Sequence, residues 1–200
     1  MLEAGEITRE DYDKWRYHYP EFDKAQKTVK LPPKASSDIL LKIERVGVMN
    51  DIVADFDKTI TQVFNILDKP LDASKYKIID RGLPHVPKSL PPGMMGIYSF
   101  YYEDRFLKIG KAGSKSNARF LSQHYNPHSA SSNLASSILK DRNMAYLNLN
   151  SQNISDWIKN HCRRIDILLD ESLGIFTLEL VEAILHYKYE PLYEGFSSQR

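Results

Sequence analysis

The sequence predicts an α+β protein in which a small antiparallel sheet of three strands is flanked by helices and preceded by a helical region. Three observations carry this prediction. Hydrophobic residues recur at helical spacing in the first third of the chain, prolines cluster near its middle, and short apolar runs typical of strands begin at Gly96. With 200 residues, 42% of them hydrophobic, the chain can form one domain with a full core and a helical extension.

The N-terminal helical region is expected over residues 1–70. Residues 1–30 are predicted to form two short helices broken at Pro20, and a longer helix runs from Ser36 or Ser37 to about Leu67. The longer helix repeats apolar residues every seven positions, in two sets: Ile39, Val46, Val53, Ile60 and Leu67, and Met49, Phe56 and Val63. One interpretation is a coiled coil that forms a homodimer through the 37–67 helix. The other is an amphipathic helix packed on the two shorter ones, which the width of its apolar stripe favours.

Residues 71–95 are predicted to form a proline-rich linker that contains one short strand, Tyr76 to Ile79. Proline-rich segments are semi-rigid spacers, so the linker would hold the helical region at a defined distance from residues 96–200.

The third segment, residues 96–200, begins with a predicted β-hairpin. Two apolar and aromatic runs, residues 97–102 and 106–109, flank the polar tip Glu103-Asp104. The patterns that follow predict helices at 117–125, 133–140 and 155–160, a third strand at 163–169, and a last helix at about 173–189 that ends before Pro191.

Composition narrows the class of protein. Residues 1–10 lack the apolar run of a signal peptide, and no stretch of the sequence approaches the length that crosses a membrane. We therefore expect a soluble cytoplasmic protein without a membrane partner. Cys162 is the single cysteine, which excludes an internal disulfide and a cysteine-based zinc site.

The net charge of +1 hides a segregation of charge along the chain. Residues 105–164 contain ten basic and two acidic residues, whereas residues 165–200 contain seven acidic and two basic residues. A basic block beside an acidic one suits a track for a polyanion next to a carboxylate that binds a metal ion. Two solvated surfaces of different charge are an equally good interpretation.

An ordered set of motifs lies in the third segment. The tripeptide Gly96-Ile97-Tyr98 is followed by Lys108-Ile109-Gly110, then by Arg119, and later by Glu182, nine residues before Pro191. Over Gly96 to Tyr193 this set resembles the active site of the GIY-YIG nucleases. The resemblance implies a metal-dependent endonuclease that hydrolyses phosphodiester bonds in DNA, with a restriction-like or defence-related role.

The residues of these motifs suit the steps of phosphodiester hydrolysis. Glu182 would bind Mg²⁺ or Mn²⁺, because hard cations prefer carboxylate oxygen, and Arg119 would hold a phosphate oxygen. Tyr98 would bind or deprotonate the attacking water, which requires a cation such as Lys108 or the metal ion to favour its phenolate. His124 is similar to a histidine often found after the family's arginine, and a catalytic role is about as well supported as a structural one.

Two further sets of residues bear on the predicted site. Lys111, Lys115, Ser116 and Asn117 precede Arg119 and are the candidate nucleic-acid-binding residues, with Ser116 or Asn117 as helix cap. On a helical wheel Glu182 lies at the edge of the buried stripe of the last helix, where residues line clefts. Glu179 and His186 are expected almost opposite that stripe, so Glu182 is the preferred metal ligand.

Two residues depart from the family pattern. Lys108 stands where the second motif has tyrosine, as it does in some restriction-type members, and Glu194 stands where asparagine is usual. Tyr98 and Lys108 can share a site only on the same sheet face, which a two-residue turn in a regular hairpin would prevent. We therefore expect either a three-residue loop, residues 102–104, or a bulge, with Tyr98 opposite Lys108.

A second hypothesis belongs to a different class of protein. In this interpretation the chain is a catalytically weak nucleic-acid-binding module, which grips nucleic acid through its basic segment and recruits a partner through its N-terminal helices.

Overall fold

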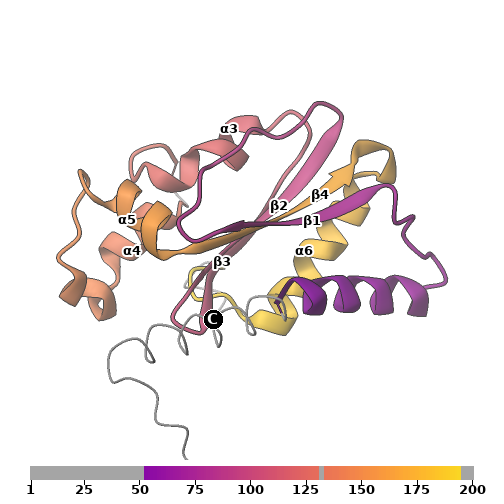
Figure 1. Cartoon of the computed structure of the whole chain (residues 1–200), viewed down its shortest axis with the longest axis horizontal. Helices are drawn as coiled ribbons and strands as arrows, with labels where there is room; N and C mark the ends of the chain where they lie inside the picture. The colour runs from indigo at the N-terminus through magenta and orange to yellow at the C-terminus, as the bar shows by residue number, and fades with distance from the viewer. Residues whose placement is uncertain (1–51, 131–132, 195–200) are drawn as a thin grey trace, which may run out of the picture. The chain divides into compact units, whose positions relative to one another are not determined.

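The computed structural model describes residues 52–130 and 133–194 (Figure 1). The chain divides into two units at Val46 and Gly47, and the described residues all belong to the second unit. The helices expected in residues 1–30, and the first part of the 37–67 helix, lie outside the described residues.

An antiparallel sheet of four strands forms the centre of the second unit. The strands are β1 (Tyr76–Gly82), β2 (Met94–Tyr102), β3 (Arg105–Ala112) and β4 (Arg163–Asp170), in the spatial order β1-β4-β2-β3. The α+β class is confirmed, but the predicted count of three strands is wrong. The fourth strand is β1, which extends the short strand expected in the linker to seven residues, six of them paired with β4. This pairing satisfies backbone groups that would otherwise form an open edge on β4.

The helices follow the predicted order. Within the described ranges, no helix is both long and apolar enough to cross a membrane. A helix covers residues 52–66. The other helical elements are α3 (Asn117–Leu121), the 3-10 turn η1 (Gln123–Tyr125), α4 (Leu134–Lys140), η2 (Arg142–Leu147), α5 (Ile154–His161), η3 (Glu171–Leu173) and α6 (Ile175–Tyr189).

Helices cover both faces of the sheet, so the core has two parts (Figure 1). Alternate residues of β2 point to opposite faces. Tyr98 and Phe100 join the core under α3, α4 and α5, whereas Met95 and Ile97 join the core formed with α6 and the 52–66 helix. We call these the Tyr98 face and the Ile97 face.

The 52–66 helix uses its apolar side chains inside this unit. Phe56, Ile60 and Phe64 are buried on the Ile97 face. Near the start of the 52–66 helix, the Asp55 carboxylate accepts hydrogen bonds from Lys188 and Tyr189 of α6, at 2.6 and 2.5 Å. Residues 52–66 thus pack on the sheet and α6, and the expected packing on two shorter N-terminal helices involves residues outside the described ones.

The hairpin between β2 and β3 contains a bulge. Glu103 and Asp104 form a two-residue turn with positive φ angles of 44° and 63°, and Tyr101 pairs with Phe106. The register then shifts by one residue, so that Phe100 pairs with Lys108 and Tyr98 pairs with Gly110. The predicted bulge is confirmed. The alternative of a three-residue loop is wrong, and so is the expectation that Lys108 lies opposite Tyr98.

The bulge decides which face Lys108 occupies. Paired residues of neighbouring strands share a face, so Lys108 lies with Phe100 and Tyr98. Without the extra residue, Lys108 would point to the Ile97 face instead. The one-residue insertion therefore brings the two motif residues to the same side of the sheet.

Candidate active site

Tyr98 reaches the edge of the sheet because its neighbour on β3 is glycine. Its side chain is fully buried, and its hydroxyl and ring lie over Gly110, where any Cβ would overlap them. β3 is an edge strand of the sheet. Gly110 thus places the phenol hydroxyl at the border between the core and the outer edge of the sheet.

Arg119 comes to the same place through a second close packing contact. A Cβ on Gly96 would overlap Phe120 of α3, so the missing side chain lets α3 lie directly on β2. Arg119, the preceding residue, is exposed at its outer part, and its Nε donates a hydrogen bond of 3.0 Å to the Tyr98 hydroxyl. The two glycines of the motifs therefore position the tyrosine and the arginine.

A buried network of charged side chains on β4 holds α3 against the sheet. Arg164 of β4 donates to the Phe120 carbonyl at 2.8 Å and to Asp166 at 2.7 Å. Asp166 lies opposite Tyr98 on β4 and also accepts a 2.7 Å hydrogen bond from Arg81. Sequence reasoning missed this network; its signal was the pair of opposite charges at alternate positions of an apolar strand.

The network continues through Tyr125 to His85. The Tyr125 hydroxyl accepts from Arg164 at 2.9 Å and lies 2.8 Å from His85 Nε2. His85 Nδ1 lies 2.8 Å from the carbonyl of Cys162. Burial lowers the pKa of His85 to about 4, so its imidazole is neutral at pH 7.

The Tyr98 phenol is neutral at physiological pH. Burial raises its pKa to about 12, against the opposing effect of the Arg119 guanidinium, and the carboxylates of Glu194 and Glu182 raise it further. Sequence reasoning expected Lys108 or a metal ion to favour the phenolate. In the structure the cation in contact with the phenol is Arg119.

His124 packs on Tyr98 in the same core. The two ring centroids are 4.3 Å apart, and the histidine is only 2% exposed. Burial and the nearby cations, Lys108 first among them, lower its pKa to about 2. Its Nδ1 accepts from the Leu134 N–H at 3.4 Å, which leaves the proton of the neutral ring on Nε2. That Nε2 has no hydrogen-bond partner within the described residues.

Glu182 lies on the Ile97 face of the sheet, on the side of α6 that is next to β3. Its carboxylate oxygen Oε2 is 2.5 Å from Lys111 Nζ, and Glu179 is 3.9 Å from the same ammonium. His186, one turn further along α6, lies 2.9 Å from the Ile109 carbonyl through Nε2. The expectation that Glu179 and His186 lie opposite the packed stripe is therefore wrong, because all three residues line the side of α6 next to β3.

Glu182 nevertheless belongs to the surroundings of Tyr98. Its charge raises the pKa values of both Tyr98 and Arg119, so all three groups interact electrostatically around the edge strand. Glu182 is also the less exposed of the two glutamates on this side of α6. The Glu182 side chain is 16% exposed and that of Glu179 is 49% exposed.

The residues around Glu182 fit a Mg²⁺ or Mn²⁺ ion held mainly by water and substrate. Within the described ranges, no group of three or more His, Cys, Asp or Glu side chains gathers to hold a metal. Mg²⁺ commonly binds one or two carboxylates and keeps several waters. A partly exposed glutamate suits that mode, although Lys111 already neutralises one of its oxygens.

The four candidate nucleic-acid-binding residues differ in their surroundings. Lys115 and Ser116 are exposed next to Arg119. Ser116 occupies the N-cap position of α3 but makes no capping bond with its side chain. Asn117 Oδ1 accepts a 2.8 Å hydrogen bond from the Leu90 N–H, so it holds the preceding segment. Lys111, the fourth, is paired with Glu182.

The folded structure pairs many of the basic residues in the basic block with carboxylates. Five of the ten basic residues in the basic block form ion pairs: Lys108 with Glu194, Lys111 with Glu182, Lys159 with Asp156, Arg163 with Asp80, and Arg164 with Asp166. Three of these carboxylates come from the acidic block. The basic residues that remain exposed beside the site, such as Lys115 and Arg119, define a smaller positive area than the sequence indicates.

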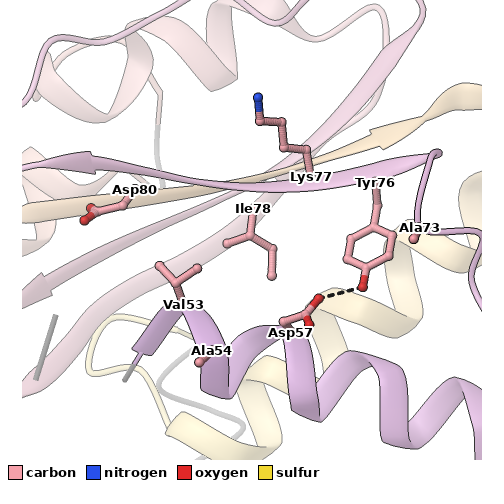
Figure 2. Close-up of a pocket in the computed structure, with 8 residues that line it drawn as sticks. All are labelled: Val53, Ala54, Asp57, Ala73, Tyr76, Lys77, Ile78 and Asp80. Carbon is pink, nitrogen blue, oxygen red and sulfur yellow. Dashed lines mark hydrogen bonds between the residues drawn. The ribbon is translucent and has the colours of Figure 1, made fainter. Parts of the chain in front are cut away.

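A separate hollow lies between the 52–66 helix and β1 (Figure 2). It has a volume of about 690 Å³ and is lined by Val53, Ala54, Asp57, Ala73, Tyr76, Lys77, Ile78 and Asp80. The Tyr76 hydroxyl donates to Asp57 at 2.6 Å, while Lys77 points away on the far side of β1. None of the motif residues lines this hollow. The candidate site therefore lies elsewhere, around Tyr98 and Arg119.

Comparison of the chain with models of protein families, with curated proteins and with solved structures finds no match in any of the three. The function considered next therefore rests on the motifs and on the geometry of the site.

Proposed function

We propose that the chain is a metal-dependent endonuclease of the GIY-YIG type, which hydrolyses phosphodiester bonds in DNA in a restriction-like or defence-related role. One observation carries the proposal: the Tyr98 hydroxyl and Arg119 Nε are 3.0 Å apart, within the electrostatic reach of Glu182. These residues come from β2, α3 and α6, and the chain brings them together at one edge strand. These residue types suit the steps of phosphodiester hydrolysis.

In this proposal each side chain has a distinct task. The exposed part of the Arg119 guanidinium binds a phosphate oxygen and stabilises its growing negative charge. Tyr98, whose pKa is about 12, orients the attacking water as a neutral hydrogen-bonding group. Glu182 would hold Mg²⁺ or Mn²⁺, which supplies positive charge at the phosphate and favours deprotonation of the attacking water.

The second candidate function is a nucleic-acid-binding module with weak or no catalysis, which recruits a partner or a second copy through its N-terminal helices. Its specific support is the state of the charged groups. Glu182 is already paired with Lys111, Lys108 is paired with Glu194, and burial disfavours the Tyr98 phenolate. Lys115 and Arg119 remain exposed for phosphate contacts.

One experiment separates the two candidates. The full chain is incubated with plasmid, single-stranded DNA and RNA in Mg²⁺ or Mn²⁺, beside Glu182→Ala and the matched control Glu179→Ala. For the endonuclease we expect cleavage of DNA that falls by about a hundredfold or more in Glu182→Ala and changes little in Glu179→Ala. Binding of nucleic acid without cleavage by the wild-type protein would support the binding module. Equal cleavage by both variants would remove Glu182 from the site.

A further inference from the structure

The segment after α6 returns along the bulged strand. The chain turns at Glu190, which has a positive φ of 43°. The N–H groups of Leu192 and Tyr193 then donate to the carbonyls of Phe106 and Leu107, at 3.0 and 2.9 Å. Successive carbonyls of a regular strand point to opposite sides, so both can face one segment only because the bulge interrupts the alternation.

The end of this segment meets Lys108. Lys108 Nζ is 2.8 Å from Glu194 Oε1 and donates a 3.2 Å hydrogen bond to the Tyr193 carbonyl. The lysine side chain is 2% exposed and the glutamate side chain 21% exposed. A buried ammonium requires such partners, because the loss of hydration is otherwise uncompensated.

Lys108 and Glu194 are the two residues that depart from the family pattern, and the structure places them in contact. Both belong to the surroundings of Tyr98. Lys108 lies on the Tyr98 face and helps to lower the pKa of His124, which packs on the phenol. The Glu194 carboxylate raises the pKa of Tyr98 itself. The two residues that depart from the family pattern therefore form one ion pair near Tyr98.

We propose that Glu194 is a positioning residue of the site, which holds the Lys108 ammonium on the Tyr98 face, and that Lys108 and Glu194 act as one unit. This inference rests on the proposed nuclease function. Removal of either partner leaves the charge of the other uncompensated on the Tyr98 face, whereas removal of both takes away two opposite charges together. The effects of the single changes on the site are thus strongly non-additive.

The test is a double-mutant cycle in the full chain with Lys108→Met, Glu194→Gln and the combined variant. We expect each single variant to unfold at a midpoint roughly 4–8 °C lower and the double variant to fall no further than the worse single. Cleavage of plasmid in Mg²⁺ should fall about tenfold in each single variant and recover in part in the double. The exposed pair Lys159–Asp156, 3.4 Å apart, is the matched control, and its cycle should be additive and small.

A pH profile separates a role in the site from a purely structural one. Glu194→Gln removes a negative charge from the surroundings of Tyr98, where the attacking water would bind. Deprotonation of that water is then favoured, so the pH dependence of the cleavage rate should move to lower pH. Should Lys108→Met or Glu194→Gln not fold, Glu194→Asp, which keeps the charge and shortens its reach, tests the contact with Lys108 at a smaller loss of stability.

The outcomes of the cycle are distinct. Additive effects on both the unfolding midpoint and cleavage overturn the inference. Coupling in stability with an unchanged cleavage rate and pH profile also overturns it, because the pair would then serve only the fold. If the wild-type protein cuts no nucleic acid, the proposed function fails. The double-mutant cycle is then read in the unfolding midpoint and in DNA affinity, and additive effects on both would show that Lys108 and Glu194 do not act as one unit.

Discussion

The Tyr98 hydroxyl lies over the Cα of Gly110 on the neighbouring strand, in the space that a side chain would fill. Gly110→Ala should therefore displace the phenol from Arg119. Since the phenol is fully buried and the new methyl group would overlap both its hydroxyl and ring, we expect the site to lose alignment. The predicted result is a loss of DNA cleavage of about a hundredfold or more, measured as an initial rate in Mg²⁺.

Gly113 supplies the control for this change. A Cβ at Gly113 meets no atom within 4 Å, so Gly113→Ala adds the same group three residues away without a clash. We expect its cleavage rate and unfolding midpoint to stay near those of the wild type. Equal rates for the two alanine variants would show that the position of Tyr98 over Gly110 has no part in the activity.

The contact between Tyr98 and Arg119 can be tested by removal of a single oxygen atom. Tyr98→Phe keeps the ring that packs on Phe120 and His124, but Arg119 Nε loses its 3.0 Å acceptor. Because Arg119 is exposed at its outer part, water can replace the lost acceptor, and we expect the unfolding midpoint to change little. Cleavage should fall by about a hundredfold, since the water-orienting group is gone.

Tyr101→Phe is the matched control for that variant. Tyr101 lies on the same strand but belongs to the Ile97 face, and its hydroxyl is 3.5 Å from Asp104 at the surface. The control should cleave at the wild-type rate. If Tyr98→Phe also kept the full rate, the tyrosine would have only a packing role.

The elements that sequence reasoning predicted well depend on local patterns. The helix α6 and the strand β4 were located within a few residues, because apolar periodicity and Pro191 are visible in neighbouring residues. The hairpin was also predicted, and the need for a bulge followed from the faces of Tyr98 and Lys108. The position of the bulge could not be predicted, because it depends on the pairing along the whole ladder. In the structure Gly110, and not Lys108, lies opposite Tyr98.

The features that sequence reasoning missed depend on contacts between distant segments. The four prolines that follow β1 predict a linker, and only the pairing of β1 with β4 shows that this strand completes the sheet. The hydrogen bond from the Leu90 N–H to Asn117 Oδ1 joins two segments far apart in the sequence, and nothing local indicated it. Lys108 and Glu194 were each recognised as unusual, yet nothing local indicated that the segment after α6 returns to β3 and joins them.

The ion pair between Lys111 and Glu182 leads to a prediction about metal affinity. An ammonium 2.5 Å from the carboxylate competes with a divalent cation for the same oxygen. Lys111→Met should therefore tighten Mn²⁺ binding by about tenfold, because one unit of positive charge beside the ligand is removed. Calorimetric titration of the protein with Mn²⁺ in the absence of nucleic acid measures this affinity directly.

The same titration has an internal check. Glu182→Gln should bind Mn²⁺ much more weakly whether or not Lys111 is present, whereas Glu179→Gln, further from the ammonium, should bind nearly as the wild type does. If Lys111→Met bound Mn²⁺ more weakly than the wild type, the lysine would help to hold the site and would not compete for it.

Two buried histidines predict how stability depends on pH. Burial lowers the pKa of His85 to about 4 and that of His124 to about 2, whereas an unfolded histidine has a pKa of about 6.5. As the pH falls below 6.5 the unfolded chain binds two protons that the folded protein does not, so the folded state loses stability. At pH 5 this loss should be on the order of 2 kcal/mol for each histidine relative to pH 7.

The measurement is the free energy of unfolding in urea at pH 7 and at pH 5, for the wild type, His124→Gln and His85→Gln. Each variant is expected to be less stable than the wild type at pH 7, because both side chains fill space in the core. The difference between the two pH values, however, should shrink by about 2 kcal/mol in each variant, since one titrating group has been removed. An unchanged pH difference in His124→Gln would mean that this imidazole is protonated in the folded protein, beside Lys108 and Arg119, and would remove the electrostatic basis for its neutral state.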